Sequence, residues 1–295
     1  MVKRRDIHCV RAALWGMVFW SLVIGSACEE QPPAQPFKCN GFEHLCDRSL
    51  EDITFVHTHN SHSTEEDGVD AFALNHLLGI PRQLRDGVRS FNVDVYRYES
   101  EVVVCHGSCV FGSRPFLSVL QTFVEFMEEN PREVIMLALQ QETTHTDIID
   151  VVEQSGLEPF LHSQTVGALW PTLRELIDSG RRFIFFAGSN QGTRSWYHSA
   201  GNYMMGTPWE VNYPEDLGCE LSGAVPEHKL LELVHTMIRP FAQLHVSEEI
   251  NYNPFLEERV AKCTREWGRK PNFISVDFYS HSDVFSVVEE LNAPD

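Results

Sequence analysis

The stretch V-H-T-H-N-S-H-S (residues 56–63) carries an apolar run directly into a cluster of polar side chains. Two later stretches repeat the pattern: G-V-R-S-F-N-V-D-V (residues 87–95) and V-V-C-H-G-S-C (residues 103–109). The polar groups at the ends of these runs are His59, Asn60, Asn92, Asp94 and His106. Each of these apolar runs resembles a strand and stops at a polar group. This pattern predicts a site where several strands end together.

Around these stretches, short apolar runs alternate with amphipathic segments over residues 38–293. Strands are expected at residues 53–56, 88–96, 101–105, 134–139, 183–186, 242–246 and 273–278. Helices are expected at residues 72–84, 116–127, 147–161, 169–178, 225–241, 254–267 and 284–291, with a long loop over 189–224. This alternation predicts a parallel sheet buried on both faces. A single α/β domain fits, namely a TIM-type (β/α) barrel that is distorted or incomplete.

The charge balance is acidic, with 23 Lys and Arg against 42 Asp and Glu among 295 residues. Proteins that track nucleic-acid phosphates need a basic face, so nucleic acid is not expected as a partner. A lipid or phosphodiester substrate stays compatible with this balance, because one local pocket can oppose the global charge.

The N-terminus resembles an export signal rather than part of the fold. Four basic residues flank an uncharged apolar stretch, residues 12–24, which ends in small residues before Cys28. The stretch is too short for a comfortable membrane span. Cys28 resembles the acylated cysteine of bacterial lipoproteins, with ordinary cleavage after Ala27 as the alternative. We therefore expect a signal peptide at 1–27, a Pro- and Gln-rich tether at 28–37, and a chain that is secreted or anchored to a bacterial envelope.

Six cysteines remain after the leader, and an even number in an exported chain predicts disulfides. They are Cys39, Cys46, Cys105, Cys109, Cys219 and Cys263. Six cysteines allow about 15 pairings. The two pairs close in sequence need little chain to close, which leaves the last two for each other. A zinc site is the weaker interpretation because no C-x-x-C pair occurs.

The residues at the strand ends suit cleavage of a phosphodiester by an internal hydroxyl. That reaction needs a base, an acid and positive charge near the phosphorus. Histidine suits the first two roles because its pKa of about 6.5 lies near the operating pH. A divalent cation held by oxygen ligands can supply the charge. His59 and His106 would be the acid–base pair, with Asn60, Asn92, Asp94 and one of residues 140–142 around the cation.

Several motifs extend this pattern, and together they resemble a known family. T-H-N-S (58–61), C-H-G-S-C (105–109), N-P-R-E-V-I-M-L-A-L (130–139) and P-N-F-I-S-V-D-F-Y (271–279) resemble the X-domain of phosphatidylinositol-specific phospholipase C. The chain looks most similar to the secreted PLC-like phosphodiesterases. C-N-G-F-E-H-L-C-D-R-S (39–49) is similar to their N-terminal cysteine loop, so the resemblance covers roughly residues 38–293.

The resemblance implies that His59 and His106 flank the scissile phosphate. It also implies a divalent cation, Ca²⁺ or Mg²⁺, because Asn60 and Asp94 match the calcium-dependent branch rather than the calcium-independent enzymes. Two positions depart from that branch. Asn92 stands where a Glu is expected, and Gln141, or its neighbour Gln140, stands where a second Glu is expected. One carboxylate among amides predicts weak binding of the cation, because ligand charge sets affinity.

Other residues have candidate roles with structural alternatives. Asp277 could orient His59 through its second ring nitrogen, or make a hydrogen bond in the core. Asp94 could instead pair with Arg89 or Arg97. Arg114 and Trp209 could contact the substrate, or lie at a helix start and in a loop. The chain is expected to act as a monomer on a phospholipid or glycerophosphodiester at a membrane surface.

Two other functions stay open at this point. One is a metal-dependent phosphodiesterase of the glycerophosphodiester or sphingomyelinase D type, which usually has the acidic residue that Asn92 replaces. The other is a catalytically inactive barrel that serves as a binding lipoprotein, which Asn92 and the pair Gln140–Gln141 favour.

Overall fold

The computed structural model describes residues 37–188, 194–221, 223, 225–238 and 241–294. The contacts divide the chain into two units, Met1–Phe37 and Lys38–Asp295. The expected leader, the anchor at Cys28 and the tether up to residue 36 lie outside the described residues. None of the described helices combines the length and apolar character that a membrane span needs.

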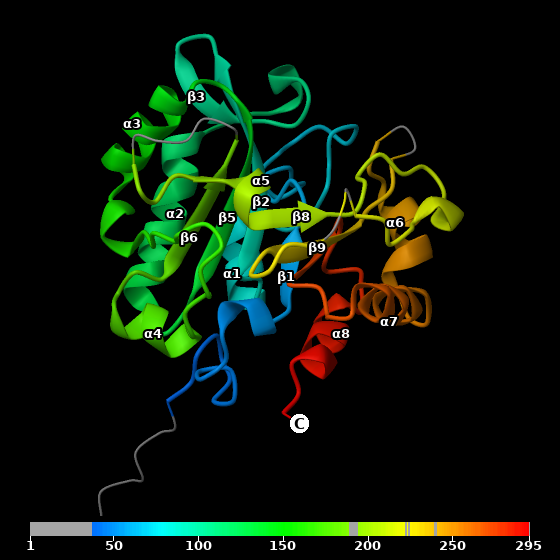
Figure 1. Ribbon diagram of the computed structural model, residues 1–295. Helices are drawn as coiled ribbons and strands as arrows, with labels where there is room; N and C mark the ends of the chain where they lie inside the picture. The colour runs from blue at the N-terminus through cyan, green and yellow to red at the C-terminus, as the bar shows by residue number, and fades with distance from the viewer. Residues whose placement is uncertain (1–36, 189–193, 222, 224, 239–240, 295) are drawn as a thin grey trace, which may run out of the picture. The chain divides into compact units, whose positions relative to one another are not determined.

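A curled, mostly parallel sheet forms the centre of the second unit (Figure 1). Its strands are β1 (Phe55–Thr58), β2 (Ser90–Tyr98), β3 (Glu101–Val104), β4 (Arg114–Pro115), β5 (Ile135–Glu142), β6 (Phe183–Ala187), β7 (His198–Ser199), β8 (Met204–Gly206), β9 (Leu230–His235) and β10 (Phe273–Val276). The pairing order is β7-β6-β5-β2-β1-β10-β9-β8, in which the neighbours are parallel. β3 and β4 extend β2 sideways as antiparallel strands.

This sheet confirms the expected incomplete barrel. β1 pairs with β10, so the first and last strands of the chain meet at its centre. The edge strands β7 and β8 are joined in the chain by the short helix α5 (Ala200–Tyr203). Among the described residues, no pairing closes β7 onto β8. The barrel is therefore open along one side.

Helices cover the outer face of the sheet (Figure 1). Besides α5 they are α1 (Ile80–Asp86), α2 (Phe116–Glu129), α3 (His145–Ser155), α4 (Leu173–Asp178), α6 (Leu244–Asn251), α7 (Phe255–Trp267) and α8 (Val284–Leu291). Outward-facing strand residues such as Phe91 and Phe183 pack with helix residues such as Phe123 in one buried core. Phe123 contacts these two rings edge to face, with centroids at 5.0 and 5.6 Å. Truncating a phenylalanine in such a core costs about 3–5 kcal/mol.

The face of the sheet that lines the barrel interior is polar across four adjacent strands. Side chains alternate along a strand, so the residues between the core positions point inward. Within these strands and just beyond their ends, the inward polar residues are His57, His59, Ser90, Asn92, Asp94, Glu232, Ser275 and Asp277. None of them belongs to the apolar core. The interior is thus suited to binding as well as to packing.

Several expected elements are wrong. Residues 230–235 form a strand rather than a helix, and residues 244–251 form a helix rather than a strand. The run L-L-E-L-V-H fits both periods, and periodicity alone cannot distinguish short apolar runs. The expected helix over 72–84 is reduced to α1, and the expected loop over 189–224 contains β7, α5 and β8.

The three disulfides are the three expected pairs. They join Cys39 to Cys46, Cys105 to Cys109 and Cys219 to Cys263. The last of them ties the segment before β9 to α7 across 44 residues. The other two close short loops, one at the start of the domain and one directly after β3.

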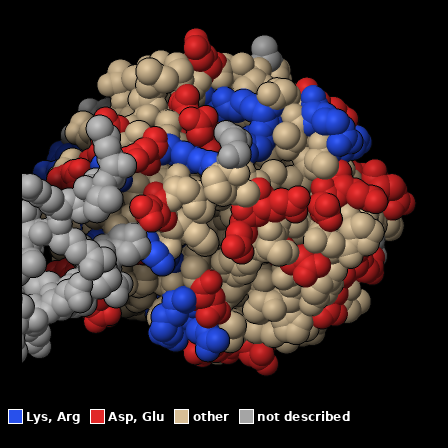
Figure 2. Space-filling view, turned by 90° about the horizontal axis from the view of Figure 1, so that it is seen from below, with Lys and Arg blue, Asp and Glu red and all other residues tan. Residues whose placement is uncertain are grey.

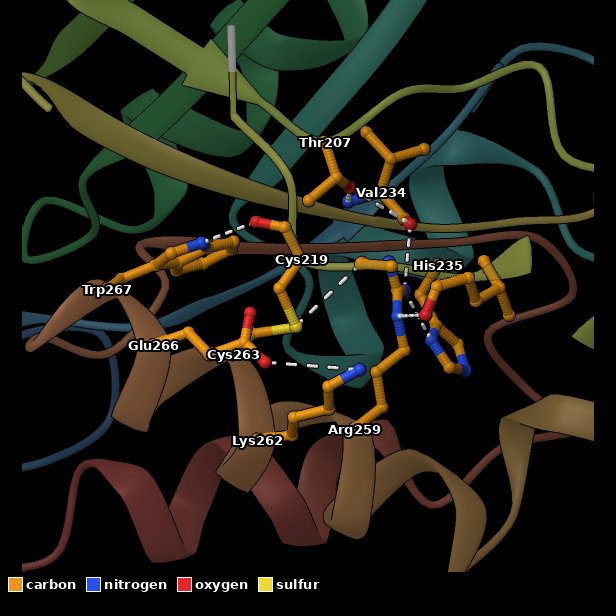
Figure 3. Close-up of a disulfide and its surroundings, with 11 residues drawn as sticks. Thr207, Cys219, Val234, His235, Arg259, Lys262, Cys263, Glu266 and Trp267 are labelled. Carbon is orange, nitrogen blue, oxygen red and sulfur yellow. Dashed lines mark hydrogen bonds and ion pairs between the residues drawn. A yellow bond between two sulfur atoms is a disulfide. The ribbon is translucent and has the colours of Figure 1, made fainter. Parts of the chain in front are cut away.

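A buried guanidinium lies beside the Cys219–Cys263 disulfide (Figure 3). Arg259 of α7 is only 6% exposed. Its acceptors are the carbonyl oxygens of Leu217, Gly218 and Val234 and Nδ1 of His235, at 2.8–3.2 Å. Burial lowers the pKa of Arg259 to about 10, against the opposing effect of Glu220, so the group stays charged at neutral pH. One cation therefore joins a loop, β9 and α7.

Candidate active site

His59 lies one residue beyond β1, where the strand reaches the mouth of the barrel. Its backbone N–H donates to the carbonyl of Val276 at 3.1 Å, which extends the pairing of β1 with β10. Its Nδ1 is 3.0 Å from Oδ1 of Asp277, the residue directly after β10. The carboxylate is 2% exposed and the imidazole 24%. A buried carboxylate thus orients an imidazole that solvent can reach, and Nε2 is left to exchange a proton.

The segment between β1 and α1 holds this pair in place through Asn75 and His76, which no sequence motif singled out. Asn75 Nδ2 donates to Asp277 Oδ1 at 2.8 Å. His76 Nε2 donates to the carbonyl of His59 at 2.7 Å. From α6, Asn251 Nδ2 donates to the backbone carbonyl of Asp277 at 2.8 Å. All three side chains are buried. Adjacent polar residues in a loop have no periodic signal, so sequence reasoning could not find them.

His106 follows β3 and is fixed in two ways. Its Nδ1 is 2.9 Å from the carbonyl oxygen of Ala73, in the same segment between β1 and α1. The Cys105–Cys109 disulfide closes a loop around it. The backbone N–H of Cys105 donates to the carbonyl of Asp94 at 3.3 Å. The second imidazole is therefore oriented through Nδ1, like the first.

Asn60 connects His106 with Asp94 and Asn92. Its φ of 48° lies in the left-handed region, which asparagine tolerates better than most residues. Its backbone N–H donates to Asn92 Oδ1 at 3.1 Å. With its side-chain nitrogen facing Asp94, the amide donates to the two carboxylate oxygens at 2.9 and 3.3 Å and to Asn92 Oδ1 at 3.2 Å. Its oxygen then accepts from Nε2 of His106 at 3.3 Å, so one amide links the carboxylate to the imidazole.

The same oxygen atoms fit a weakly held divalent cation. In the opposite orientation of the Asn60 amide, its side-chain oxygen faces Asp94. This oxygen then lies within 3.3 Å of both carboxylate oxygens of Asp94 and of Oδ1 of Asn92. Ca²⁺ and Mg²⁺ prefer such oxygen ligands, and one carboxylate among amides gives low affinity. In the described part of the chain, no group of three or more His, Cys, Asp or Glu side chains could hold a metal. Amide oxygens would therefore have to complete the ligand set.

The ionisation of the site groups is set mainly by burial. Burial raises the pKa of Asp94 to about 7, helped by Glu142 and opposed by His59. Burial alone would lower the pKa of His59, but Asp277 and more distant carboxylates outweigh it, and the net shift is upward. Burial lowers the pKa of His106. The pKa values of the two imidazoles are thus separated, as those of an acid and a base at one site often are.

Gln141 does not join the other expected cation ligands. The register of β2 with β5 pairs Asp94 with Gln140, so Gln140 and Glu142 face inward and Gln141 faces the opposite side. Its Oε1 accepts from the hydroxyl of Tyr197 at 2.6 Å. The expectation for Gln141 is wrong because alternation turns only every second residue of β5 toward the interior.

The arginines and the tryptophan considered as site residues lie elsewhere. The relevant ion pairs are Arg89–Glu133, Arg97–Asp147 and Arg114–Asp67. Asp94 therefore does not pair with either arginine proposed for it. Arg114 ties the β3–β4 extension to the segment between β1 and α1. Trp209 follows β8 and is 58% exposed, so the structure does not place it in the barrel.

This protein is a half-open (β/α) barrel. The ends of its strands carry two oriented imidazoles, an amide link and a buried carboxylate. Residues 45–292 match the family model described as PI-PLC X 1. The chain belongs to the PI-PLC X family.

Relatives of this chain occur in fungal and plant sequences. PI-PLC X domain-containing protein 1 of Arthroderma benhamiae is 26% identical over 289 residues, which cover 88% of this chain and 91% of the relative. An uncharacterized secreted protein of the same organism is 26% identical, over 89% of this chain and 66% of that protein. A PI-PLC X domain-containing protein of Arabidopsis thaliana is 23% identical, over 82% and 62%. This chain thus spans about two thirds of the latter two proteins.

Solved structures share the fold. Phosphatidylinositol-specific phospholipase C from Staphylococcus aureus superposes with a TM-score of 0.62 and 13% identity, over 84% of this chain and 94% of that enzyme. A variant of the same enzyme gives 0.62 and 14%, over 85% and 94%. At this identity the comparison concerns the fold alone, which is that of a TIM-type phospholipase barrel.

Proposed function

We propose that this chain is an exported phosphoric diester hydrolase or lyase that cleaves a phospholipid or glycerophosphodiester. The observation that carries the proposal is that His59 and His106 are both held through Nδ1, with Asn60 and Asp94 beside them. Family membership supports the reaction class. The disulfides and a secreted relative support export.

In the proposed reaction, His59 acts as the base and His106 as the acid. His59 takes the proton of a headgroup hydroxyl, whose oxygen then attacks phosphorus. Asp277 stabilises the imidazolium that forms. The bond from phosphorus to the leaving oxygen breaks, and His106 gives that oxygen a proton. The first product is a cyclic phosphate, which water can open in a second step.

The test is turnover of phosphatidylinositol, glycerophosphoinositol and a lysophospholipid, each with and without Ca²⁺ or Mg²⁺. A cyclic phosphate seen by ³¹P NMR is the expected first product. A product in which the headgroup leaves without its phosphate would favour the sphingomyelinase D-type alternative. Absence of turnover under every condition would contradict the proposed enzymatic activity and favour the alternative, a catalytically inactive barrel that serves as a binding lipoprotein.

We further propose that Asn60, Asn92 and Asp94 hold the cation when it is present. A bound Ca²⁺ or Mg²⁺ supplies positive charge to the phosphate oxygens. Asp94 contributes the carboxylate, and the amides contribute neutral oxygens.

Replacing Asp94 with Asn should weaken cation binding about tenfold or more, because the site loses its formal charge. Calorimetric titration of the full chain with Ca²⁺ alone measures this without reference to activity. Asp70→Asn, an exposed carboxylate in the segment between β1 and α1, is the matched control and should bind like the wild type. Equal affinity of the wild type and Asp94→Asn would place the cation elsewhere.

Exposed apolar side chains next to the site support a lipid substrate. Phe72 is 65% exposed and directly precedes Ala73, whose carbonyl holds His106. Its ring contacts that of Phe241, which is 45% exposed, with centroids at 6.3 Å. Phe111 is 41% exposed, and its carbonyl accepts from Asp70 N–H at 2.7 Å. Contiguous apolar side chains beside a site mark a surface that meets a partner or a membrane.

Phe72→Ser should therefore reduce hydrolysis of phosphatidylinositol in vesicles, while turnover of soluble glycerophosphoinositol stays unchanged. We expect a loss of about fivefold or more in vesicle binding, since burying a phenylalanine contributes about 1.5–3 kcal/mol. Vesicle sedimentation and the two assays measure it. Leu169→Ser, at a position 70% exposed just before α4, is the control. An equal loss on both substrates would instead mean that Phe72 supports the catalytic segment.

A further inference from the structure

A hollow of about 620 Å³ lies on the outer side of the barrel, next to β6. Residues 158–163, α4 with the residues around it, and residues 195–196 border this hollow. In a (β/α) barrel, each strand is followed by a helix that packs on the outside. No described residues form a helix between β6 and β7, and Trp196 packs on Phe185 of β6 instead, with ring centroids at 5.4 Å. The hollow therefore occurs where the helical layer is interrupted.

The hollow is separate from the candidate active site. His162 lines it and donates its backbone N–H to the carbonyl of Phe183, the first residue of β6, at 2.9 Å. His59 and Asp277, by contrast, follow the last residues of β1 and β10. Because these strands belong to one parallel run, the start of β6 lies at the end of the barrel that is opposite to the mouth. A ligand in the hollow would not contact the two imidazoles of the active site.

The floor of the hollow is apolar, and its size suits a small ligand. Leu161, Leu176 and Trp196 line it and are 3%, 1% and 6% exposed. Clefts of about 300–1,000 Å³ are typical of sites that bind small molecules. These three side chains can therefore cover one apolar face of a ligand of this size.

Two hydrogen-bond donors at the hollow are available to a ligand. Arg181 is exposed, and its guanidinium donates to the carbonyl of Glu158 at 2.9 Å. No carboxylate pairs with Arg181 among the described residues. The indole N–H of Trp196 is buried and has no acceptor in the described part of the chain. Buried donors are nearly always paired in folded proteins, so this N–H indicates an acceptor that comes from outside the chain.

His162 brings an acceptor to the same hollow. Gln164 Nε2 donates to the carbonyls of Ala168 and Leu169 at 3.0 and 3.1 Å, so Oε1 of this amide is free to accept. Nε2 of His162 lies 3.1 Å from that Oε1 and must therefore be the donor. Burial lowers the pKa of His162, although Gln164 opposes the shift, so the ring is neutral at neutral pH. Its Nδ1 then accepts a hydrogen bond.

The charges at the hollow disfavour an anionic ligand. Its charged lining residues are the carboxylates of Glu158 and Glu175 and the guanidinium of Arg181. A phosphate or carboxylate would thus meet a net negative charge, and like charges repel. A neutral ligand must instead accept from the guanidinium and donate to the carboxylates and the imidazole. Hydroxyl groups do both.

We propose that this hollow is a binding site for a neutral sugar. The apolar face of the sugar ring lies against Leu161, Leu176 and Trp196. Its hydroxyl groups accept from Arg181 and donate to His162 and Glu158. The site does not depend on the proposed reaction, and a chain held to a glycan by this side would keep the mouth of its barrel free.

Ligand-observed NMR titration of the full chain tests this site. The probes are glucose, galactose and mannose, each as the free sugar and as the methyl glycoside, together with glucuronate. At least one neutral sugar should bind with saturation, and glucuronate should bind more weakly than glucose. Arg181→Gln should weaken the bound sugar about tenfold, because a charged donor becomes neutral. Arg85→Gln, at an exposed position of α1 that does not line the hollow, should bind like the wild type.

Two further variants locate the sugar. Trp196→Phe keeps an aromatic ring but removes the N–H, so it should also bind more weakly, whereas His59→Ala should bind like the wild type. A methyl glycoside that binds as well as its free sugar assigns the site to the end of a glycan, and binding of the free sugar alone assigns it to a small sugar. Absence of saturable binding of every neutral sugar, tighter binding of glucuronate than of glucose, or equal binding by Arg181→Gln would overturn the proposal. Loss of binding in His59→Ala would place the sugar at the mouth of the barrel and would overturn it as well.

Discussion

Alanine at His59 or at His106 is expected to reduce hydrolysis of a phosphodiester by about 10²- to 10⁴-fold, because each variant lacks one of the two proton-transfer groups. The double variant should be no slower than the slower single variant, since groups that act as a unit are not additive. The measurement is kcat/KM on a soluble glycerophosphodiester, which avoids effects of membrane binding. His162→Ala, a half-buried histidine outside the barrel, should retain full activity.

The pH dependence gives a further check on the same pair. The pKa of His59 is raised and that of His106 lowered, so the two limbs of a bell-shaped profile should lie above and below the usual value of about 6.5. Asp277→Asn removes the carboxylate that raises the pKa of His59, so the alkaline limb should move to lower pH. An unchanged alkaline limb in this variant would contradict the pairing of His59 with Asp277.

Arg259→Leu is expected to destabilise the domain by about 3 kcal/mol or more, a large part of a typical total of about 5–15 kcal/mol. The substitution removes the buried donor for three carbonyl oxygens and for Nδ1 of His235 (Figure 3). Each acceptor left without a donor costs about 1–3 kcal/mol, and relief of the buried charge offsets part of the sum. Urea unfolding followed by circular dichroism measures the difference in the free energy of unfolding. The dependence of this free energy on urea concentration should be the same for the variant and the wild type.

Lys262→Ala provides the comparison on the same helix. Lys262 is 56% exposed and pairs with Glu266 at 3.9 Å, so its loss should change stability by no more than about 0.5 kcal/mol. If Arg259→Leu were as stable as Lys262→Ala, the buried contacts of Arg259 would be replaceable by packing alone.

Much of the barrel follows from the sequence because most strands are unambiguous. F-I-F-F-A (183–187) is aromatic and β-branched, lies between polar segments and forms β6 as expected. L-L-E-L-V-H (230–235) mixes leucine with one acidic residue and fits a helix equally well. Placing it in a helix concealed the inward direction of Glu232. An error in one short element therefore hid a residue of the barrel interior.

The site was predictable where a residue directly follows a strand. His59 and Asp277 follow adjacent strands, and their side chains meet as expected. Gln141 was assigned wrongly because its position in the sequence does not reveal which face of β5 it occupies. Asn75 could not be predicted, because its contact with Asp277 spans 202 residues and leaves no pattern in the chain.

One side of the molecule carries charged side chains of both signs. On the side of the molecule seen from below, basic side chains occur in separate groups among acidic ones (Figure 2).

The Cys105–Cys109 bridge has a consequence for when the chain could act. His106 lies between the two bridged cysteines, so its placement depends on their oxidation. In surroundings that keep thiols reduced, the loop would lack this constraint, and the imidazole would rely on its contacts with Ala73 and Asn60. Under the proposed function, the chain would therefore reach full activity only after this bridge has formed.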